Sequence, residues 1–367
     1  MSFHHCAFPN CGGPQSHTVA LAESDDAVNW NLVANFPFYQ GSVPDVICRG
    51  SKLYLFTPGE VKRFDQLSQQ WDANPQSVSI TDSIGNPIQF VDPSAFVDDS
   101  GRLCLFFLNA TGLVGDPAYC ATPPCTAYFD SAVEVPGSEG TQFIKQTGHR
   151  IAYTTNTNYK PTDPDIFFHL NTYYQYISFG TGTMVYTSNT LHGNYIQVAT
   201  LPNGYLTQSN AGVPCGMFDQ NSGMFYSYGH RNGVNGTEIT MASHLDFSVQ
   251  ANYNLLFTGN SIGLGNVQVA SPGICINTFL PNPIDEKMDD HAIKLWPNPS
   301  DGHVMIQSKN RIKDVIIYDL TGKKIKTHLK VMKQSPSLFF DIQAGLYIVQ
   351  CFDEKNEVTF TKMLIQK

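Results

Sequence analysis

The sequence predicts an all-β protein, and three observations lead to that fold class. Glycine (29 residues), proline (22), tyrosine (17) and phenylalanine (24) are abundant, whereas charged residues make up only 14% of the 367 positions. Turn formers and aromatic residues at this level favour many short strands. Apolar residues do not recur at helical spacing over any long stretch, and a strand–turn–strand pattern repeats along the chain.

The charge distribution predicts two domains. Residues 285–367 hold 13 basic and 11 acidic side chains, and the rest of the chain holds 9 basic and 20 acidic ones. An acidic first domain argues against a nucleic-acid partner. We therefore expect a first domain over residues 1–279, a linker over residues 280–290 and a second domain over residues 291–367.

Strand and turn patterns in the second domain predict a small β-sandwich. Residues 295–302 contain a Pro-Asn-Pro turn followed by a glycine, residues 315–324 read as a buried strand entering a tight turn, and residues 344–349 and 362–367 supply closing strands. These segments resemble, in the same order, the C-terminal sorting domain of the type IX secretion system. The resemblance implies export to the outside of the cell or to its surface, with residues 291–367 recognised by the export machinery. An adhesive sandwich domain is the alternative.

The two ends of the sequence and its hydropathy bear on export. No run of 18 apolar residues occurs, so we expect no membrane span. The first six residues lack a basic segment followed by an apolar core, so they do not read as a signal peptide, and we expect the natural chain to begin further upstream.

Nine cysteines are present, and none forms a Cys-x-x-Cys motif. The close pairs Cys6/Cys11 and Cys120/Cys125 lie in loop-like sequence, where each pair is either a disulfide or two free thiols. Cys48, Cys104 and Cys215 fall in apolar strand patterns, which predicts buried, unreactive thiols.

Four segments of the first domain align on a proline. Residues 42–56, 91–107, 162–176 and 212–228 each read as an apolar strand, a polar turn and an aromatic strand, with Pro44, Pro93, Pro164 and Pro214 in register. That pattern is typical of the inner hairpin of a propeller blade. Residues 23–30 resemble an outer strand, whose inner strand is either lost upstream or supplied by residues 267–276. Together these repeats predict a five-bladed β-propeller.

The repeats resemble glycoside hydrolase family 43. Residues 91–103 are close to the family's Asp-Pro phrase with a following Asp-Asp-x-Gly turn, and Val43-Pro44-Asp45 falls on the preceding blade. The resemblance implies that Asp45 tunes the pKa of the general acid. The acid position, a glutamate in the family, falls near Asp163, with Asp165 two residues on along the same strand face and Asp92 nearby. The expected general base has no equivalent, because Ser271-Pro272 carries no carboxylate.

Hydrolysis of a glycosidic bond with inversion requires one carboxylic acid to protonate the leaving oxygen and a second carboxylate, roughly 6.5–9.5 Å away, to activate water. The resemblance therefore implies a secreted glycosidase that acts on polysaccharide or oligosaccharide, with no required cofactor and no catalytic metal. A non-catalytic propeller that binds glycan, or a surface adhesin, is the alternative. Asp92 and Asp163 have a second interpretation, because an Asp-Pro at the start of a propeller strand is often a turn device whose carboxylate accepts backbone N–H bonds.

Three further residues are candidates for ligand binding. His230 falls where some family members have an axial histidine, sometimes beside a bound ion, although such a histidine is more often a satisfied wall residue. Tyr174 and Tyr228 are candidates for stacking on sugar rings. The histidines show no zinc spacing, and a central calcium or sodium ion is compatible with the fold.

Overall fold

The computed structural model describes residues 1–113, 115–219, 222–276, 294–296, 303–307, 311–319, 323–328, 337–339, 342–355 and 358–365. The chain divides into two compact units, residues 1–280 and 281–367. Strands form the regular structure of the described residues, which contain two short 3-10 turns, Pro14–Ser16 and Pro202–Gly204, and no α-helix. The predicted all-β fold is therefore confirmed. No helix among these residues is long and apolar enough to cross a membrane.

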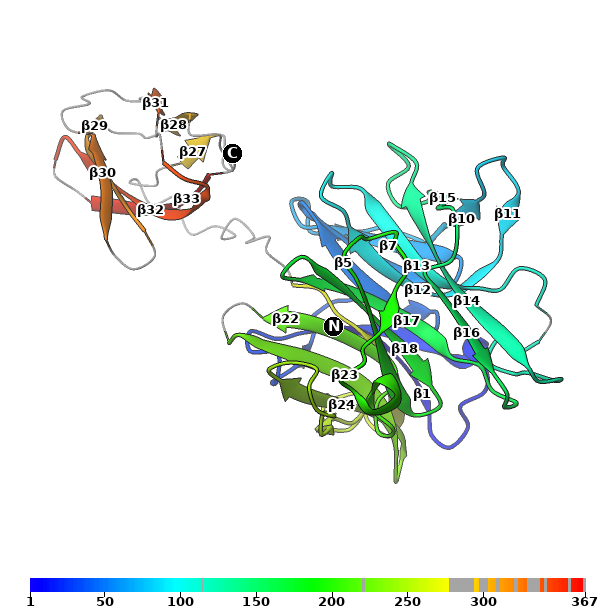
Figure 1. Ribbon diagram of the computed structural model, residues 1–367. Helices are drawn as coiled ribbons and strands as arrows, with labels where there is room; N and C mark the ends of the chain where they lie inside the picture. Colours follow the sequence, from blue (N-terminus) through cyan, green and yellow to red (C-terminus); the bar gives the residue numbers. More distant parts are fainter. Residues whose placement is uncertain are drawn as a thin grey trace. The chain divides into compact units, whose positions relative to one another are not determined.

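The first unit contains five sheets among the described residues, and in each the inner strand is followed outward by its neighbours in a fan around a common centre (Figure 1). The repeats predicted four of these hairpins. They begin with β5 (Asp45–Arg49), β12 (Phe90–Val97), β17 (Thr162–His169) and β22 (Gly212–Asp219), which pair with β6 (Lys52–Thr57), β13 (Leu103–Asn109), β18 (Thr172–Phe179) and β23 (Met224–Gly233).

Outer strands complete these four sheets. Counted outward from the inner strand, the third strands of these sheets are β7 (Glu60–Asp65), β14 (Cys125–Glu134), β19 (Gly182–Ser188) and β24 (Gly236–His244). Shorter outer strands are β8 (Gln70–Trp71), β9 (Gln76–Ser77), β10 (Ser79–Thr81), β11 (Pro87–Ile88), β15 (Gln142–Lys145), β16 (Ile151–Thr155), β20 (Ile196–Gln197), β21 (Tyr205–Thr207) and β25 (Asn254–Phe257). Alternating apolar side chains of neighbouring sheets bury one another, which forms the core between the sheets.

The fifth sheet joins the two ends of the unit. Its order is β26 (Val267–Gly273), β1 (Ser2–Ala7), β2 (Thr18–Glu23) and β3 (Asn31–Leu32), with β4 (Tyr39–Gln40) also paired to β2. Of the two options for the missing inner strand, residues 267–276 therefore supply it. A disulfide between Cys48 on β5 and Cys275, just after β26, adds a covalent connection at this closure.

That disulfide corrects one cysteine expectation. Cys48 is bonded to Cys275 rather than free, because propeller closure brings together two positions that are 227 residues apart. Cys6–Cys11 and Cys120–Cys125 are disulfides, so the first of the two options holds for each pair. Cys104 and Cys215 are buried free thiols, as predicted.

The second unit has two sheets among its described residues. One contains β27 (Lys294–Trp296), β28 (His303–Gln307) and β31 (Ser337–Phe339), and the other contains β29 (Ile312–Tyr318), β30 (Lys324–His328), β32 (Gly345–Asp353) and β33 (Val358–Ile365). Ile306 of the first sheet joins Val315, Val349 and Met363 of the second in one buried cluster, as in a small β-sandwich. The predicted linker, residues 280–290, and the Pro-Asn-Pro turn lie outside the described residues.

Candidate functional site

Five equivalent positions surround the centre of the first unit. A residue followed by proline lies within or just before each inner strand. These five pre-proline residues line one axial pocket; they are Val43, Asp92, Asp163, Val213 and Ser271. All five have positive φ angles, between 46° and 58°. Positive φ is unusual for residues other than glycine and costs of the order of 1–3 kcal/mol at each position. Five repeated outliers at one place indicate a built feature of the fold.

A local irregularity accompanies this conformation. The ladder between each inner strand and its neighbour shifts register at the proline in four of the sheets, for example between Thr162 and Asp165. Such a bulge re-aims the side chains on either side of it. Asp163 and Asp165 lie on the two sides of this shift, and both line the axial pocket.

The residue after the proline ties its strand to the next sheet. Asp45 Oδ2 accepts a hydrogen bond from the Ala95 N–H at 2.6 Å, and Asp165 Oδ2 accepts one from the Gly216 N–H at 2.8 Å. Ser94 Oγ, at the equivalent position between them, accepts the Ile166 N–H at 3.2 Å. Asp45 and Asp165 are only 7% and 6% exposed. Both carboxylates thus link neighbouring sheets through a backbone N–H.

Asp92 and Asp163 differ from that pair because each residue is half-buried, whereas Asp45 and Asp165 are buried. The Asp163 N–H points to Asp92 Oδ2 at 3.4 Å, so the two residues are adjacent. The hydroxyl of Thr162 donates to the carboxylate of Asp163. Of the five axial positions, these two alone carry ionisable side chains.

Burial alters the protonation of the pair. Loss of hydration raises the pKa of Asp92 well above its usual range, and the charge of Asp163 raises it further. Burial likewise raises the pKa of Asp163 to about 6. Two adjacent carboxyl groups in a narrow pocket disfavour double ionisation, so the pair retains one proton near neutral pH. One group can then donate a proton while the other accepts one.

Burial also raises the pKa of the two linking aspartates. The pKa of Asp45 rises to about 7, and that of Asp165 rises well above its usual range because of burial and then the charge of Asp45. Both groups line the same pocket as Asp92 and Asp163. The structure therefore brings all four predicted carboxylates together around one pocket.

The three predicted binding residues lie outside the residues that line the axial pocket. His230 pairs with Gly212 at the start of β22, and its Nε2 lies 3.1 Å from where a Cβ on Gly212 would be. Burial lowers its pKa to about 4, so the ring is neutral. Its Nδ1 is buried and has no hydrogen-bond partner among the residues that the structure describes.

Tyr174 and Tyr228 pack in the core between sheets. The Tyr174 ring stacks on Phe167 and Phe247, with centroids 5.2 and 5.0 Å away. Tyr228 is fully buried, and its hydroxyl donates to the Ala27 carbonyl at 3.0 Å. The sequence could not separate these aromatic residues from exposed ones, because tyrosines in strands and in loops have no local pattern that tells whether a neighbouring sheet covers them. In this structure neither ring faces solvent at the pocket.

Two exposed tyrosines that the sequence did not single out lie on loops near the carboxylate pair. Tyr119 and Tyr159 are 51% and 63% exposed, and they oppose each other in an isolated bridge between the loop after β13 and the loop before β17. The loops are joined by Cys120 N–H to Asn158 O at 2.8 Å, and the first is closed by Cys120–Cys125. The charge of Asp116, on the same loop, raises the pKa of both pocket carboxyls.

Metal binding has limited support in the described residues. The side chains of Cys6, Cys11 and His17 converge within 4.8 Å, but Cys6 and Cys11 are bonded to each other and offer no thiolate. A central calcium or sodium ion remains a prediction, for which Asp92 and Asp163 would supply the oxygen ligands that hard cations prefer.

Comparison with known proteins identifies the second unit. Residues 294–366 match the profile of the secretion system C-terminal sorting domain. This confirms the predicted sorting domain, and the chain is therefore a secreted or cell-surface protein. No curated protein shows significant similarity to the chain.

Several solved structures are similar to the first unit. An endo-1,4-β-xylanase from Bacteroides thetaiotaomicron is 13% identical, with a TM-score of 0.43 over 75% of this chain and 94% of that one. An α-L-arabinanase from Cellvibrio cellulosa is 15% identical, with a TM-score of 0.42 over 69% and 91%. A family 43 β-1,3-galactosidase with galactodeoxynojirimycin is 12% identical, with a TM-score of 0.45 over 66% and 86%. The activity of this chain is argued below from its own residues.

Proposed function

We propose that this exported propeller hydrolyses glycosidic bonds in an oligosaccharide or polysaccharide, with Asp92 and Asp163 as its acid–base pair. The observation that carries the proposal is the pair itself: two adjacent carboxyl groups with raised pKa values that line an axial pocket. The assignment departs from the sequence-based one, in which Asp45 and Asp163 took the leading roles. The carboxylate of Asp45 instead accepts a hydrogen bond from the Ala95 N–H.

The proposed reaction uses two carboxyl groups in different protonation states. The protonated member of the pair donates to the glycosidic oxygen as the bond breaks, and the ionised member acts on water or on the sugar. The space between the axial residues is about 20 Å³, which is room for one water molecule. The substrate would then rest on the mouth of the pocket and present its glycosidic oxygen to the carboxyl groups.

The loops beside the mouth support a carbohydrate as the ligand. Tyr119 and Tyr159 expose aromatic surface on a wall stiffened by a disulfide and by backbone hydrogen bonds. Tyrosine rings offer both apolar area and a hydroxyl, which suits the apolar face and hydroxyl rim of a sugar ring. The acidic first domain suits a neutral glycan better than a polyanion.

A second candidate is a non-catalytic glycan-binding propeller. Valine and serine occupy three of the five axial positions, Val43, Val213 and Ser271, and the pocket does not accommodate a whole sugar ring. In that case the same wall would bind a glycan without cleaving it.

The test is release of nitrophenol from a panel of aryl arabinosides, xylosides and galactosides, together with retention on polysaccharide affinity gels. The proposal predicts turnover by wild type, a loss of about 10²-fold or more in Asp92→Asn and Asp163→Asn, and no change in the control Asp82→Asn, a turn residue that does not line the axial pocket. Retention on the gel with no turnover by wild type would establish the second candidate instead.

A further inference from the structure

A second, larger cavity lies away from the axial pocket. Its volume is about 240 Å³, and its walls include Arg49, Lys52, Tyr54, Glu134 and Glu139. Strand β5 begins at Asp45, on the axial pocket, and ends at Arg49, so the two sites lie at opposite ends of that strand. The cavity is bounded by the β5–β6 hairpin of one sheet and by the segment after β14 of the next.

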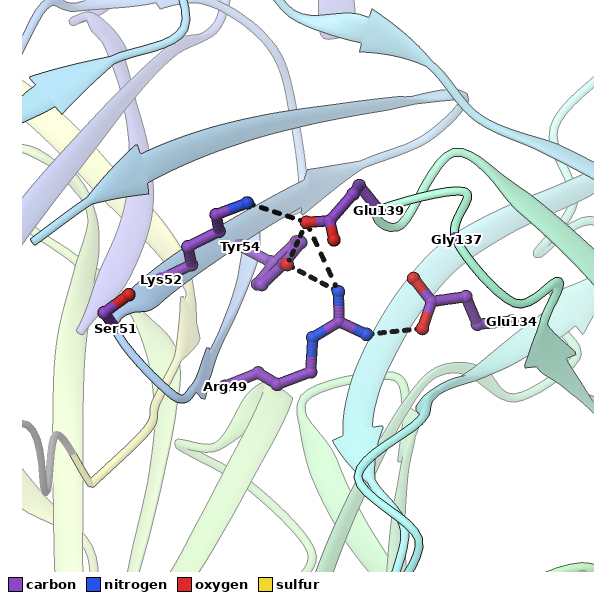
Figure 2. Close-up of a pocket in the computed structure, with 7 residues that line it drawn as sticks. All are labelled: Arg49, Ser51, Lys52, Tyr54, Glu134, Gly137 and Glu139. Carbon is purple, nitrogen blue, oxygen red and sulfur yellow. Dashed lines mark hydrogen bonds and ion pairs between the residues drawn. The ribbon is translucent and has the colours of Figure 1, made fainter. Parts of the chain in front are cut away.

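The carboxylate of Glu139 accepts the hydrogen bonds that the donor groups of this cavity offer (Figure 2). Glu139 Oε2 accepts hydrogen bonds from Lys52 Nζ at 2.9 Å and from the Tyr54 hydroxyl at 2.9 Å, and it lies 3.7 Å from Arg49 Nη2. These contacts, led by the hydrogen bond from Lys52, hold the pKa of Glu139 below its usual range. One protein carboxylate thus sits in a set of donors suited to a carboxylate ligand.

The side chain of Glu139 can leave this position while its backbone stays in place. The Glu139 carbonyl accepts a hydrogen bond from Arg63, and the following Gly140 N–H donates to Glu134 at 2.7 Å. The side chain itself is 45% exposed, and the residue has a φ of 53°. Rotation of an exposed side chain into solvent is fast and needs no change in the fold.

A buried acid, Glu134, holds Arg49 in place, and Arg49 in turn bonds to Tyr54. Glu134 is 6% exposed, and its carboxylate pairs with Arg49 and accepts the N–H groups of Gly140 and Leu103. Arg49 also bonds to the Tyr54 hydroxyl, over whose ring its guanidinium lies at 4.6 Å from the centroid. With Glu139 rotated away, Arg49 and Tyr54 would therefore keep their places, and Lys52, which is 37% exposed, would add a second positive charge at the edge of the cavity.

We propose that this cavity binds a small hydroxylated carboxylate, of the size of a single hexuronic acid, whose carboxylate takes the place of that of Glu139. The exchange replaces one carboxylate by another, so the charge on Arg49 and Lys52 stays balanced. The volume is below the range of about 300–1,000 Å³ typical of drug-sized ligands, which favours a small molecule. Ser51 and Glu134 on the wall are hydrogen-bonding partners for hydroxyl groups. This site is independent of the glycosidase proposal.

The experiment is isothermal titration of the full chain with D-galacturonate and D-glucuronate, with D-galactose as the uncharged control and acetate as the carboxylate without hydroxyls. Wild type is expected to bind one uronate per chain and not galactose. Glu139→Gln removes the competing charge but keeps the side-chain size, so its affinity is expected to rise about tenfold. Lys52→Met removes a charged donor, so its affinity is expected to fall about tenfold. Glu238→Gln, at an ion pair with Arg231 outside the cavity, is the matched charge control and is expected to leave affinity unchanged.

Each outcome decides the proposal. Opposite shifts in Glu139→Gln and Lys52→Met, with Glu238→Gln unchanged, support a site in which Glu139 competes with the ligand. Equal binding by uronate and acetate would assign the site to simple anions and overturn the hydroxylated-acid proposal. Absence of uronate binding at millimolar concentration in both wild type and Glu139→Gln would overturn the site altogether. Circular dichroism establishes that each variant is folded, and a crystal of Glu139→Gln soaked with galacturonate provides a second measurement if Lys52→Met does not fold.

Discussion

The Cys48–Cys275 disulfide should contribute more to stability than either of the other two. It closes a segment of 227 residues, whereas Cys120–Cys125 closes one of 5. In the chain-entropy account a cross-link stabilises by restricting the unfolded chain, and the effect grows with the logarithm of the loop length. The two loop lengths correspond to about 5 kcal/mol and about 2 kcal/mol, respectively.

The perturbation is a pair of double variants, Cys48→Ser with Cys275→Ser, and Cys120→Ser with Cys125→Ser. Urea unfolding of the propeller is followed by tryptophan fluorescence in a Trp296→Phe background, which leaves Trp30 and Trp71 as reporters in the first unit. The free energy of unfolding, obtained by linear extrapolation, is expected to fall about twice as far in the first variant. Equal losses, or a smaller loss for Cys48 and Cys275, would refute the argument that the length of the closed segment sets the size of each disulfide's contribution to stability.

Three further predictions concern the centre of the propeller and its rim. Asp165→Ala should lower the free energy of unfolding by about 1–3 kcal/mol, because the buried Gly216 N–H loses its acceptor; urea midpoints equal to wild type would contradict the linking role. Asp163→Asn should gain stability relative to wild type as pH rises from about 4 to about 6. The folded pKa of Asp163 is raised to about 6, so the native state holds this proton after the unfolded chain has released it, and ionisation then favours unfolding; a difference in urea midpoint independent of pH would count against a raised pKa. Tyr159→Ala should weaken retention on a polysaccharide gel about threefold to tenfold by loss of exposed aromatic surface, and unchanged retention would remove the tyrosine wall from the proposal.

The repeat pattern predicted much of the propeller. Pro44, Pro93, Pro164 and Pro214 mark four equivalent inner strands, and Ser271-Pro272 marks the fifth. These positions are visible in the sequence because each inner hairpin has the same order of apolar strand, polar turn and aromatic strand. The closing strand was left open between two options, since local sequence does not say whether the partner of a terminal strand comes from the other end of the chain.

The tasks of the four aspartates were less visible. Asp45 and Asp165 follow a proline, and Asp92 and Asp163 precede one; only the positive φ angle and the bulge at each proline show that the preceding residue faces the axis. Neither feature can be read from residue types, because valine and aspartate both adopt this conformation here. A comparison of all five pre-proline positions in the sequence would have selected Asp92 and Asp163 as the two ionisable ones.

The Cys48–Cys275 bond illustrates the same limit. Cys48 lies in an apolar strand pattern, which predicted a buried thiol, and Cys275 lies far away in the sequence. Their proximity follows from the pairing of β26 with β1, which places the end of the propeller chain beside β5. Long-range pairing of this kind is a property of the closed fold rather than of any segment.

The pH dependence of kcat/KM on a responsive aryl glycoside tests the acid–base role of Asp92 and Asp163 most directly. A pair that shares one proton predicts a bell-shaped profile. Activity falls at low pH, where the pair gains a second proton, and at high pH, where it loses its only proton. The same profile should be absent, with activity reduced at every pH, in Asp92→Asn and in Asp163→Asn. Full activity with an unaltered profile in either variant would contradict the assignment.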